Sequence, residues 1–383
     1  GVIITQRAWC SNLEMIRSVW RFLASEPPVL CDWLPWNHTF GGNHNFGIAL
    51  YNGGTLYIDD GKPTPAQFPA TVANLREIAT TAYFNVPKGY EMLLRALRAD
   101  EKLRRTFFSR LRIVFYAAAG LNQAVWDDLQ DLAYETCGEE ILMITGLGAT
   151  ETAPAALFTG REGASAGRVG LPLPGVELKV VPLENKMEAR VRGPNVTPGF
   201  WRNAELTHAS FDEEGFYRMG DAVRFADPAD PLQGFLFDGR LAEDFKLSTG
   251  TWVNVELVRT KFLKHFGDLV QDVVIAAPDR DFVAALVFPN ARVERALLQR
   301  LLDELAARGT GSSTCVVRML MLEEPPSLDA REITGKGNIN QKAVLANRAA
   351  LVEELYAAVP SGRVIEVNGG QPGMTSAWEA GID

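Results

Sequence analysis

The sequence predicts an α/β large domain with parallel and mixed sheets, followed by a small α+β domain. Over residues 13–144, short apolar runs alternate with amphipathic stretches, which is typical of a sheet covered by helices. Gly, Pro and short alternating segments dominate residues 167–237, which indicates a small antiparallel β subdomain. After residue 240, helical and strand patterns alternate again. We therefore expect two domains, residues 1–239 and 240–383.

Apolar periodicity also places the individual elements. In the large domain it predicts helices at 13–23, 72–78 and 122–137, and strands at 55–58, 112–116 and 141–144. In the small domain it predicts helices at 255–264, 294–307 and 343–357, and strands at 269–275, 282–288 and 316–321. Asn122 suits the start of its helix, because its side chain can accept a hydrogen bond from the first turn. The Gly- and Pro-rich tail from Pro360 onward predicts little regular structure.

The composition excludes several classes of protein. Of the 383 residues, 47% are apolar and 22% are charged, with 38 Lys and Arg against 47 Asp and Glu. The formal net charge of −9 argues against a nucleic-acid binder, which needs basic residues to neutralise phosphates. The lack of an apolar run of about 18 residues predicts no membrane span. With no signal-peptide pattern either, we expect a cytoplasmic protein, whose oligomeric state the sequence does not indicate.

Cysteines and histidines are few, which limits the metal and redox chemistry. The chain has 4 Cys and 4 His, and the cysteines form no CxxC pair. This spacing fits reduced thiols in the cytoplasm better than a disulfide framework or a zinc site. A multi-His metal centre is not expected either.

The most informative segment is TGLGATET, residues 145–152, which follows the predicted strand 141–144. A Gly-rich turn at the carboxyl end of a strand is a frequent ligand site in α/β sheets. Thr150 offers a hydroxyl for a phosphate, and Glu151 offers a carboxylate for Mg²⁺, which prefers oxygen ligands. The alternative is a plain strand-to-loop turn whose polar side chains face water.

Further motifs follow in order along the chain: AAAGLNQ at 117–123, GFYRMGD at 215–221, FDGRLAEDFKLSTGTWV at 237–253 and ITGKG at 333–337. Asp221 can accept hydrogen bonds from two ribose hydroxyls, and Arg240 can bind a ribose or a phosphate. Lys336, between two glycines, can bring a positive charge to a reacting phosphate. The alternatives are an exposed turn carboxylate, a surface ion pair and a solvated lysine.

The order and spacing of these segments resemble the adenylate-forming superfamily of acyl-CoA synthetases, adenylation domains and luciferases. TGLGATET is similar to its YGxTE segment, AAAGLNQ to GGAPL, FYRMGD to YxTGD, and EITGKG to the TGK segment. FDGRLAEDFKLSTG is similar to the hinge region, and LPWNHTFGG to LPLFHxxG. The resemblance extends to about residue 350. Residues 33–65 and 245–253 are most similar to the feruloyl-CoA synthetase branch.

The resemblance implies an adenylate-forming enzyme fold and a reaction in two halves. A carboxylic acid, expected to be a hydroxycinnamate such as ferulate, attacks ATP to give acyl-AMP and pyrophosphate. Coenzyme A then displaces AMP, and Mg²⁺ assists the first half. The implied catalytic residues are Lys336, Thr150 and Glu151, with Glu151 as the metal ligand.

Further roles follow from the same resemblance. The implied nucleotide-binding residues are Ala118, Ala119, Gly120, Gly148, Thr150, Asp221 and Arg240. The implied acyl-pocket residues are His38, Ala118, Gly146 and Leu147. The small domain carries Lys336 and rotates between the two halves about a hinge at Ala242 or Glu243. The implied coenzyme A loop contains Ser248, Thr249 and Gly250.

Three departures from the family pattern leave alternatives open. Leu147 replaces the family's Tyr, and Ala242 stands where the hinge usually has Asp or Lys. The family's phosphate loop normally precedes the segment that resembles GVIITQRAW, so we expect a fragment of a longer protein. Such a fragment would bind only AMP or an acyl-adenylate, or would have no ligand at all. A fatty acyl-CoA synthetase is the rival to the feruloyl enzyme.

Overall fold

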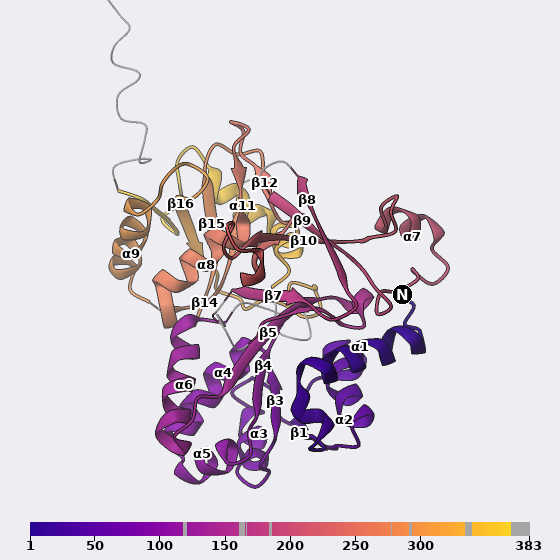
Figure 1. Ribbon diagram of the computed structural model, residues 1–383. Coiled ribbons are helices and arrows are strands. Elements are labelled where there is room, and N and C mark those ends of the chain that lie inside the picture. Colours follow the sequence, from indigo (N-terminus) through magenta and orange to yellow (C-terminus); the bar gives the residue numbers. More distant parts are fainter. Residues whose placement is uncertain are drawn as a thin grey trace, which may run out of the picture. The chain divides into compact units, whose positions relative to one another are not determined.

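The computed structural model of the chain is shown in Figure 1. It describes residues 1–117, 121–160, 165, 167–183, 186–276, 278–290, 293–333 and 339–368. The chain divides into two compact units, Gly1–Phe237 and Asp238–Asp383. Each unit buries apolar clusters of its own. No helix in the described ranges is long and apolar enough to cross a membrane.

Unit 1 is built on a nine-stranded sheet. Its strands, in spatial order, are β3 (Ala82–Asn85), β4 (Ile113–Tyr116), β5 (Leu142–Gly148), β6 (Ala155–Phe158), β7 (Arg168–Pro172), β11 (Phe235–Arg240), β10 (Tyr217–Phe225), β9 (Lys186–Arg192) and β8 (Glu177–Leu183). The pairs β3–β4 and β4–β5 are parallel, whereas β5–β6 and β6–β7 are antiparallel. The sheet therefore changes from parallel to antiparallel at β5, earlier in the chain than the predicted antiparallel region of residues 167–237.

The parallel strands are covered on both faces. The helices of unit 1 are α1 (Gln6–Val19), α2 (Gly47–Tyr51), α3 (Phe68–Leu75), α4 (Pro87–Ala99), α5 (Glu101–Phe108), α6 (Gln123–Cys137) and α7 (Ala204–Ser210). Successive side chains of a strand point to opposite faces. Ile113 and Phe115 accordingly join the cluster that contains residues of α1, while Val114 and Tyr116 join the cluster with α4, α5 and α6. In Figure 1 these three helices gather along the strands β3–β5.

The predicted cap of the helix after β4 is confirmed. α6 begins at Gln123, and the Oδ1 of Asn122 accepts a hydrogen bond from the N–H of Ala124 at 3.0 Å. A separate two-stranded parallel sheet joins β1 (Val29–Asp32) to β2 (Thr55–Ile58), and β2 has the bounds that the sequence predicts. Between them runs the π-helix η2 (Phe40–Phe46), which the sequence did not indicate.

Unit 2 contains a four-stranded sheet with helices on both faces. Its strands are, in spatial order, β14 (Val270–Ala276), β15 (Val283–Pro289), β16 (Val316–Met321) and β17 (Val364–Glu366). Its helices are α8 (Val255–Phe266), α9 (Arg295–Ala307), α10 (Gln341–Asn347) and α11 (Ala349–Tyr356). α8 and α9 share one apolar cluster with the sheet, and α10 and α11 share the other. A short hairpin, β12 (Phe245–Lys246) and β13 (Trp252–Val253), precedes α8.

The structure refines two predictions about unit 2. The stretch 343–357 is not one helix, because the chain turns at Arg348 between α10 and α11. The Arg348 guanidinium donates to both carboxylate oxygens of Glu332 at 2.9 and 2.7 Å, a buried interaction that holds this break in place. The tail from Pro360 is not wholly irregular either, since β17 pairs antiparallel with β16.

Candidate functional site

The sequence suggests a Gly-rich turn at the start of segment 145–152, but the structure has a strand there. β5 continues to Gly148, because Gly146, Leu147 and Gly148 pair with β6. The turn comes afterwards, as the short 3₁₀ helix η3 (Thr150–Thr152). The fully buried Thr152 closes it, since its hydroxyl accepts from the N–H of Ala149 at 2.9 Å. Thr150 and Glu151 remain partly exposed at the place where the sheet changes direction, a frequent ligand position in such sheets.

The two glycines of β5 have a steric role. A Cβ at Gly148 would lie 2.0 Å from the carbonyl oxygen of Pro154, and a Cβ at Gly146 would lie 2.4 Å from that of Leu157. Both obstacles are backbone atoms of the β5–β6 region, so a side chain at either position would push the strands apart. Leu147 lies between the two glycines and is buried in the apolar cluster around α1.

Two buried asparagines form hydrogen bonds with the backbone at the end of the turn and at the start of β6. The amide of Asn195 donates to the carbonyl oxygens of Thr152 and Ala155, at 3.0 and 2.8 Å. Asn12, on α1, donates to the same Ala155 oxygen at 2.8 Å and accepts from the Ala155 N–H at 3.1 Å. Sequence reasoning missed both residues, because their partners lie 40 and 143 residues away along the chain.

Strand β10 places Tyr217 near the charges of Glu151 and Asp221. Burial of the phenol, and then the charges of Glu151 and Asp221, raise the pKa of Tyr217 well above its usual value, so the hydroxyl stays protonated. The backbone oxygen of Glu151 also accepts from the N–H of Thr197 at 2.7 Å. Glu151 is therefore held through its main chain, and the Tyr217 phenol lies near both Glu151 and the largely buried Asp221.

The hinge and loop residues expected from the sequence lie in unit 2. Arg240 is exposed, and its carbonyl oxygen accepts from the N–H of Glu243 in a turn, at 3.0 Å, with Ala242 exposed inside that turn. The loop between β12 and β13 holds Ser248, Thr249 and Gly250, all exposed. Gly250 has φ +80°, a backbone conformation that side chains rarely adopt.

Four of the expected site residues lie outside the described residues: Lys336, Ala118, Ala119 and Gly120. The residues on either side of the Lys336 segment are described. Ile333 and Ile339 form an antiparallel bridge, and the N–H of Asn340 donates to the carbonyl oxygen of Glu332 at 2.8 Å. Arg348 reaches the same stretch, because it donates to Glu332 and to the oxygens of Glu324 and Pro325.

The expected acyl-pocket histidine, His38, is half-buried, and its Nδ1 accepts from the N–H of Phe40 at 3.1 Å. A second histidine, His44 in η2, is buried, and burial lowers its pKa to about 4. Its Nδ1 lies 2.8 Å from the Oδ1 of Asn45, so the ring donates there. The Nε2 then carries a lone pair, and among the described residues it has no hydrogen-bond partner.

Aromatic rings surround the His44 imidazole. Its ring centroid lies 5.1 Å from Phe115, 5.2 Å from Phe84 and 5.8 Å from Trp20. Phe158 of β6 lies 6.2 Å away, and its ring is also what a Cβ at Gly146 would touch. We call this group the His44 cluster. Through Phe158, the cluster links η2, which follows His38, to Gly146 of β5. His38 and Gly146 both belong to the predicted acyl pocket.

Comparisons with known proteins agree with this architecture. Residues 1–201 match the family described as AMP-binding enzyme. Anthranilate–CoA ligase of Pseudomonas aeruginosa is 28% identical over 244 residues, covering 62% of this chain and 43% of the relative. Malonate–CoA ligase of Arabidopsis thaliana is 24% identical over 313 residues, covering 77% of this chain and 49% of the relative.

A solved structure shows the same fold. The anthranilate CoA ligase AuaEII in complex with anthranoyl-AMP aligns with a TM-score of 0.71 at 20% identity, over 93% of this chain and 66% of that one. The chain thus spans about half the length of the curated relatives and two thirds of this structure. The fold is that of adenylate-forming enzymes, and the family match covers more than half of the chain. The chain belongs to the AMP-binding enzyme family.

Proposed function

We propose that this chain is part of an ATP-dependent acid–CoA ligase. The enzyme would activate a carboxylic acid as acyl-AMP and then transfer the acyl group to coenzyme A. The observation that carries the proposal is the position of Thr150 and Glu151 in the turn after β5, where the sheet changes from parallel to antiparallel. The CoA ligases among the relatives support it.

In the adenylation half, the attacking carboxylate and the α-phosphate both carry negative charge, so the site must supply positive charge and oriented donors. Lys336 would bridge the two groups, and the Thr150 hydroxyl would donate to the α-phosphate. Glu151 offers the carboxylate that Mg²⁺ needs, since this ion commonly takes one or two carboxylates beside substrate phosphates. When bound, Mg²⁺ would neutralise part of the phosphate charge.

The nucleotide would lie along the antiparallel part of the site. Asp221 would accept hydrogen bonds from the ribose hydroxyls, with Arg240 as a second contact. Gly148 and the segment 118–120 would contact the adenine side. We further propose that residues 1–239 form the AMP-binding domain and residues 240–383 a mobile domain. The hinge would then be at Ala242 or Glu243, and the loop of Ser248, Thr249 and Gly250 would approach coenzyme A.

For the acyl group we propose an aromatic acid, with ferulate as the first choice. His38, Ala118, Gly146 and Leu147 would line the pocket. The His44 cluster supports an aromatic substrate, since aromatic rings pack favourably against one another. The His44 Nε2, which has no hydrogen-bond partner within the described part of the chain, also favours a ring that carries a hydroxyl donor. The relatives act on anthranilate and malonate by name, so they do not distinguish ferulate from other acids.

Pyrophosphate release tests the proposal directly. We expect the 383-residue chain with Mg·ATP to release pyrophosphate when ferulate is added, and not without an acid. A medium-chain fatty acid serves as the matched alternative substrate. If the fatty acid supports release and ferulate does not, the substrate is an aliphatic acid and the hydroxycinnamate proposal is wrong. No release with any acid, together with tight AMP binding, would favour a binding-only role, which the partial coverage of the relatives also allows.

Replacing Asp221 with Ala is expected to weaken AMP binding by roughly 10- to 100-fold. A hydrogen bond to a charged group is worth about 1.5–3 kcal/mol, and Asp221 would accept from the ribose. Calorimetric titration of the variant with AMP measures the loss. The exposed Asp227 is a suitable site for the control Asp227→Ala. Equal AMP affinity in the parent chain and Asp221→Ala would remove Asp221 from the ribose site.

A further inference from the structure

Asp221, the proposed ribose ligand, belongs to a bulge in β10. Before the bulge, Arg218 pairs with Arg190 of β9. After it, Ala222 pairs with Glu188. Between these two pairs, three residues of β10 stand opposite a single residue of β9. Bulges of this kind often redirect a side chain near a functional site, and the contacts around them decide whether they persist.

The same residues could also form a regular ladder without the bulge. If the pairing after the bulge continued backward along β10, Asp221 would lie opposite Ala189. Met219 would then lie opposite Val191, the place that Tyr217 has in the structure. Because this slip is of two residues, it keeps the alternation of faces, and Met219 and Tyr217 pack in the same apolar cluster. The apolar side chains alone therefore do not fix the register.

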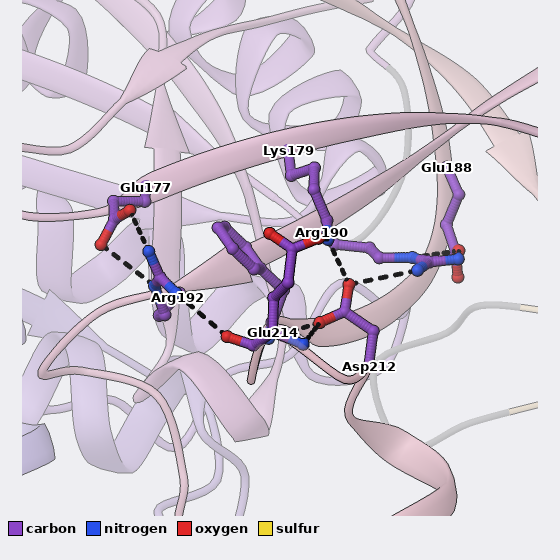
Figure 2. A network of polar contacts seen from close by, with 8 residues as sticks. Glu177, Lys179, Glu188, Arg190, Arg192, Asp212 and Glu214 are labelled. Atoms are coloured by element: carbon purple, nitrogen blue, oxygen red, sulfur yellow. Dashed lines mark hydrogen bonds and ion pairs between the residues drawn. The ribbon is translucent and has the colours of Figure 1, made fainter.

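Charged side chains hold the turn before β10 against β9, as Figure 2 shows. The Oδ2 of Asp212 lies 3.2 Å from the Nη1 of Arg190 and 2.6 Å from the Nζ of Lys179. The Nε and Nη2 of Arg190 lie 2.7 and 2.6 Å from the Oε2 of Glu188. Arg190 and Glu188 are the two residues of β9 that face the ends of the bulge. The turn is thus bound to β9 at the place where the bulge lies.

The backbone of the turn connects this contact to the start of β10. The Oδ1 of Asp212 accepts from the N–H groups of Glu214 and Phe216, at 3.1 and 2.9 Å. The N–H of Asp212 donates to the carbonyl oxygen of Phe216 at 2.9 Å, and Tyr217 follows as the first residue of β10. A slip of two residues would move the turn by about 7 Å along β9. Such a slip would separate Asp212 from Arg190.

Burial makes this separation costly. Only 7% of the Asp212 side chain, 8% of that of Glu188 and 12% of that of Arg190 are exposed. Removing one partner of a buried ion pair leaves a charge without compensation, whereas an exposed pair contributes little. The pair of Arg192 and Glu177, also in Figure 2, is of the exposed kind, with 44% and 60% of the side chains exposed.

We propose that Arg190 and Asp212 are positioning residues that keep the bulge in the register that places Asp221 at the ribose, an inference that rests on the ribose role proposed for Asp221. The variant Asp212→Asn tests this. It removes the charge that meets Arg190 and keeps an oxygen that can accept from the N–H groups of the turn. The expected result is a loss of ribose recognition, with the remaining nucleotide contacts retained.

The experiment compares AMP with 2′,3′-dideoxy-AMP, which lacks both ribose hydroxyls, by calorimetric titration of the 383-residue chain. The parent chain is expected to prefer AMP by roughly 10- to 100-fold, the range for hydrogen bonds to a charged group. Asp212→Asn is expected to lower this preference by roughly tenfold, mainly through weaker AMP binding. A general loss of folded protein would weaken the binding of both nucleotides by the same factor, so it would leave the preference unchanged.

Thermal melting first identifies a temperature at which each variant is folded. The matched control is Glu177→Gln, which removes a carboxylate charge from an exposed pair and should keep the AMP preference. A second variant, Arg190→Lys, keeps the positive charge but loses the planar group that contacts Glu188 and Asp212 together. It is expected to lower the AMP preference as well. In an Asp221→Ala background, neither variant should cause a further change.

The outcomes are distinct. If the parent chain prefers AMP and both variants keep that preference, the positioning role is wrong and the ribose site stands. A loss of equal size in the Asp221→Ala background would also overturn the positioning role, because it would arise elsewhere. A parent chain that binds both nucleotides equally well would remove the ribose role of Asp221, and the positioning role with it. A parent chain that binds neither nucleotide would contradict the proposed function itself.

Discussion

Replacing Asp32 with Asn is expected to raise the free energy of unfolding of unit 1 by about 2–4 kcal/mol at pH 8, and by little at pH 4. Asp32 is 4% exposed, and burial raises the pKa of its carboxyl to about 7. The side chain of Asn45 and the N–H of Leu34 oppose this shift and only reduce it. The folded chain therefore holds the proton more tightly than the unfolded chain does.

The sign follows from this difference in pKa. Stability that depends on the protonated carboxyl is fully present below the ordinary value of 3.8 and is lost as the pH rises through about 7. Asparagine has no charge to bury and keeps an oxygen that can accept from the Leu34 N–H, an interaction of 3.2 Å. The stabilisation by the variant should therefore grow between pH 4 and pH 8.

Calorimetric melting at several pH values measures this effect. For a unit of this size, each kcal/mol is worth about 2–4 °C in Tm. The neighbouring Asp60 is exposed, so Asp60→Asn is the matched control and should change little at any pH. Burial also lowers the pKa of His44 to about 4, but this residue is present in both parent and variant. Its effect on the Tm therefore cancels when the two proteins are compared at the same pH. A Tm gain that does not vary with pH would contradict the buried charge as its cause.

Replacing Lys336 with Ala is expected to slow adenylate formation by about 10²- to 10³-fold and to spare the second half of the reaction. Removing a donor aimed at a developing transition-state charge typically costs about 3–4 kcal/mol, and Lys336 is proposed to act only while the α-phosphate is attacked. Ferulate-dependent pyrophosphate release measures the first half. Conversion of supplied feruloyl-AMP and coenzyme A to the thioester measures the second.

The exposed Lys342 at the start of α10 provides the control, as Lys342→Ala removes the same charge nearby. Both measurements need an active protein, so they are made in the chain if it releases pyrophosphate, and otherwise in a longer protein that includes it. Equal losses in the two halves would contradict the role proposed for Lys336. An effect of tenfold or less would be too small for a residue that stabilises the transition state.

Much of the fold could be predicted because its signals are local. Strands β2 and β16 have the bounds that their apolar runs predicted, and α6 starts after the Asn122 cap. The predictions failed where a distant partner decides the structure. Residues 145–148 resemble a Gly-rich turn, yet they remain in β5 because β6 pairs with them. The break at Arg348 depends on Glu332, which the helical pattern of 343–357 does not include.

The candidate-site residues divide in the same way, into those with a local sequence signal and those without one. Thr150, Glu151 and Asp221 are candidates because each belongs to a short motif with its own spacing, and their roles stay predictions. Tyr217 belongs to one of those motifs too, but nothing in its sequence position indicates that it lies near the charges of both Glu151 and Asp221. His38 was predicted from a motif, whereas His44 gains its interest from burial among the rings of three strands and of Trp20. Only the folded chain reveals such neighbours.

The glycines of β5 limit which substitutions the proposed acyl pocket can accept. Backbone oxygens of Pro154 and Leu157 occupy the space that side chains at Gly148 and Gly146 would need, and backbone atoms cannot repack as a flexible side chain can. Leu147 lies between them in an apolar cluster, where a change of size or shape can be absorbed by neighbouring side chains. A mutant library aimed at new acyl groups should therefore vary position 147 and keep both glycines.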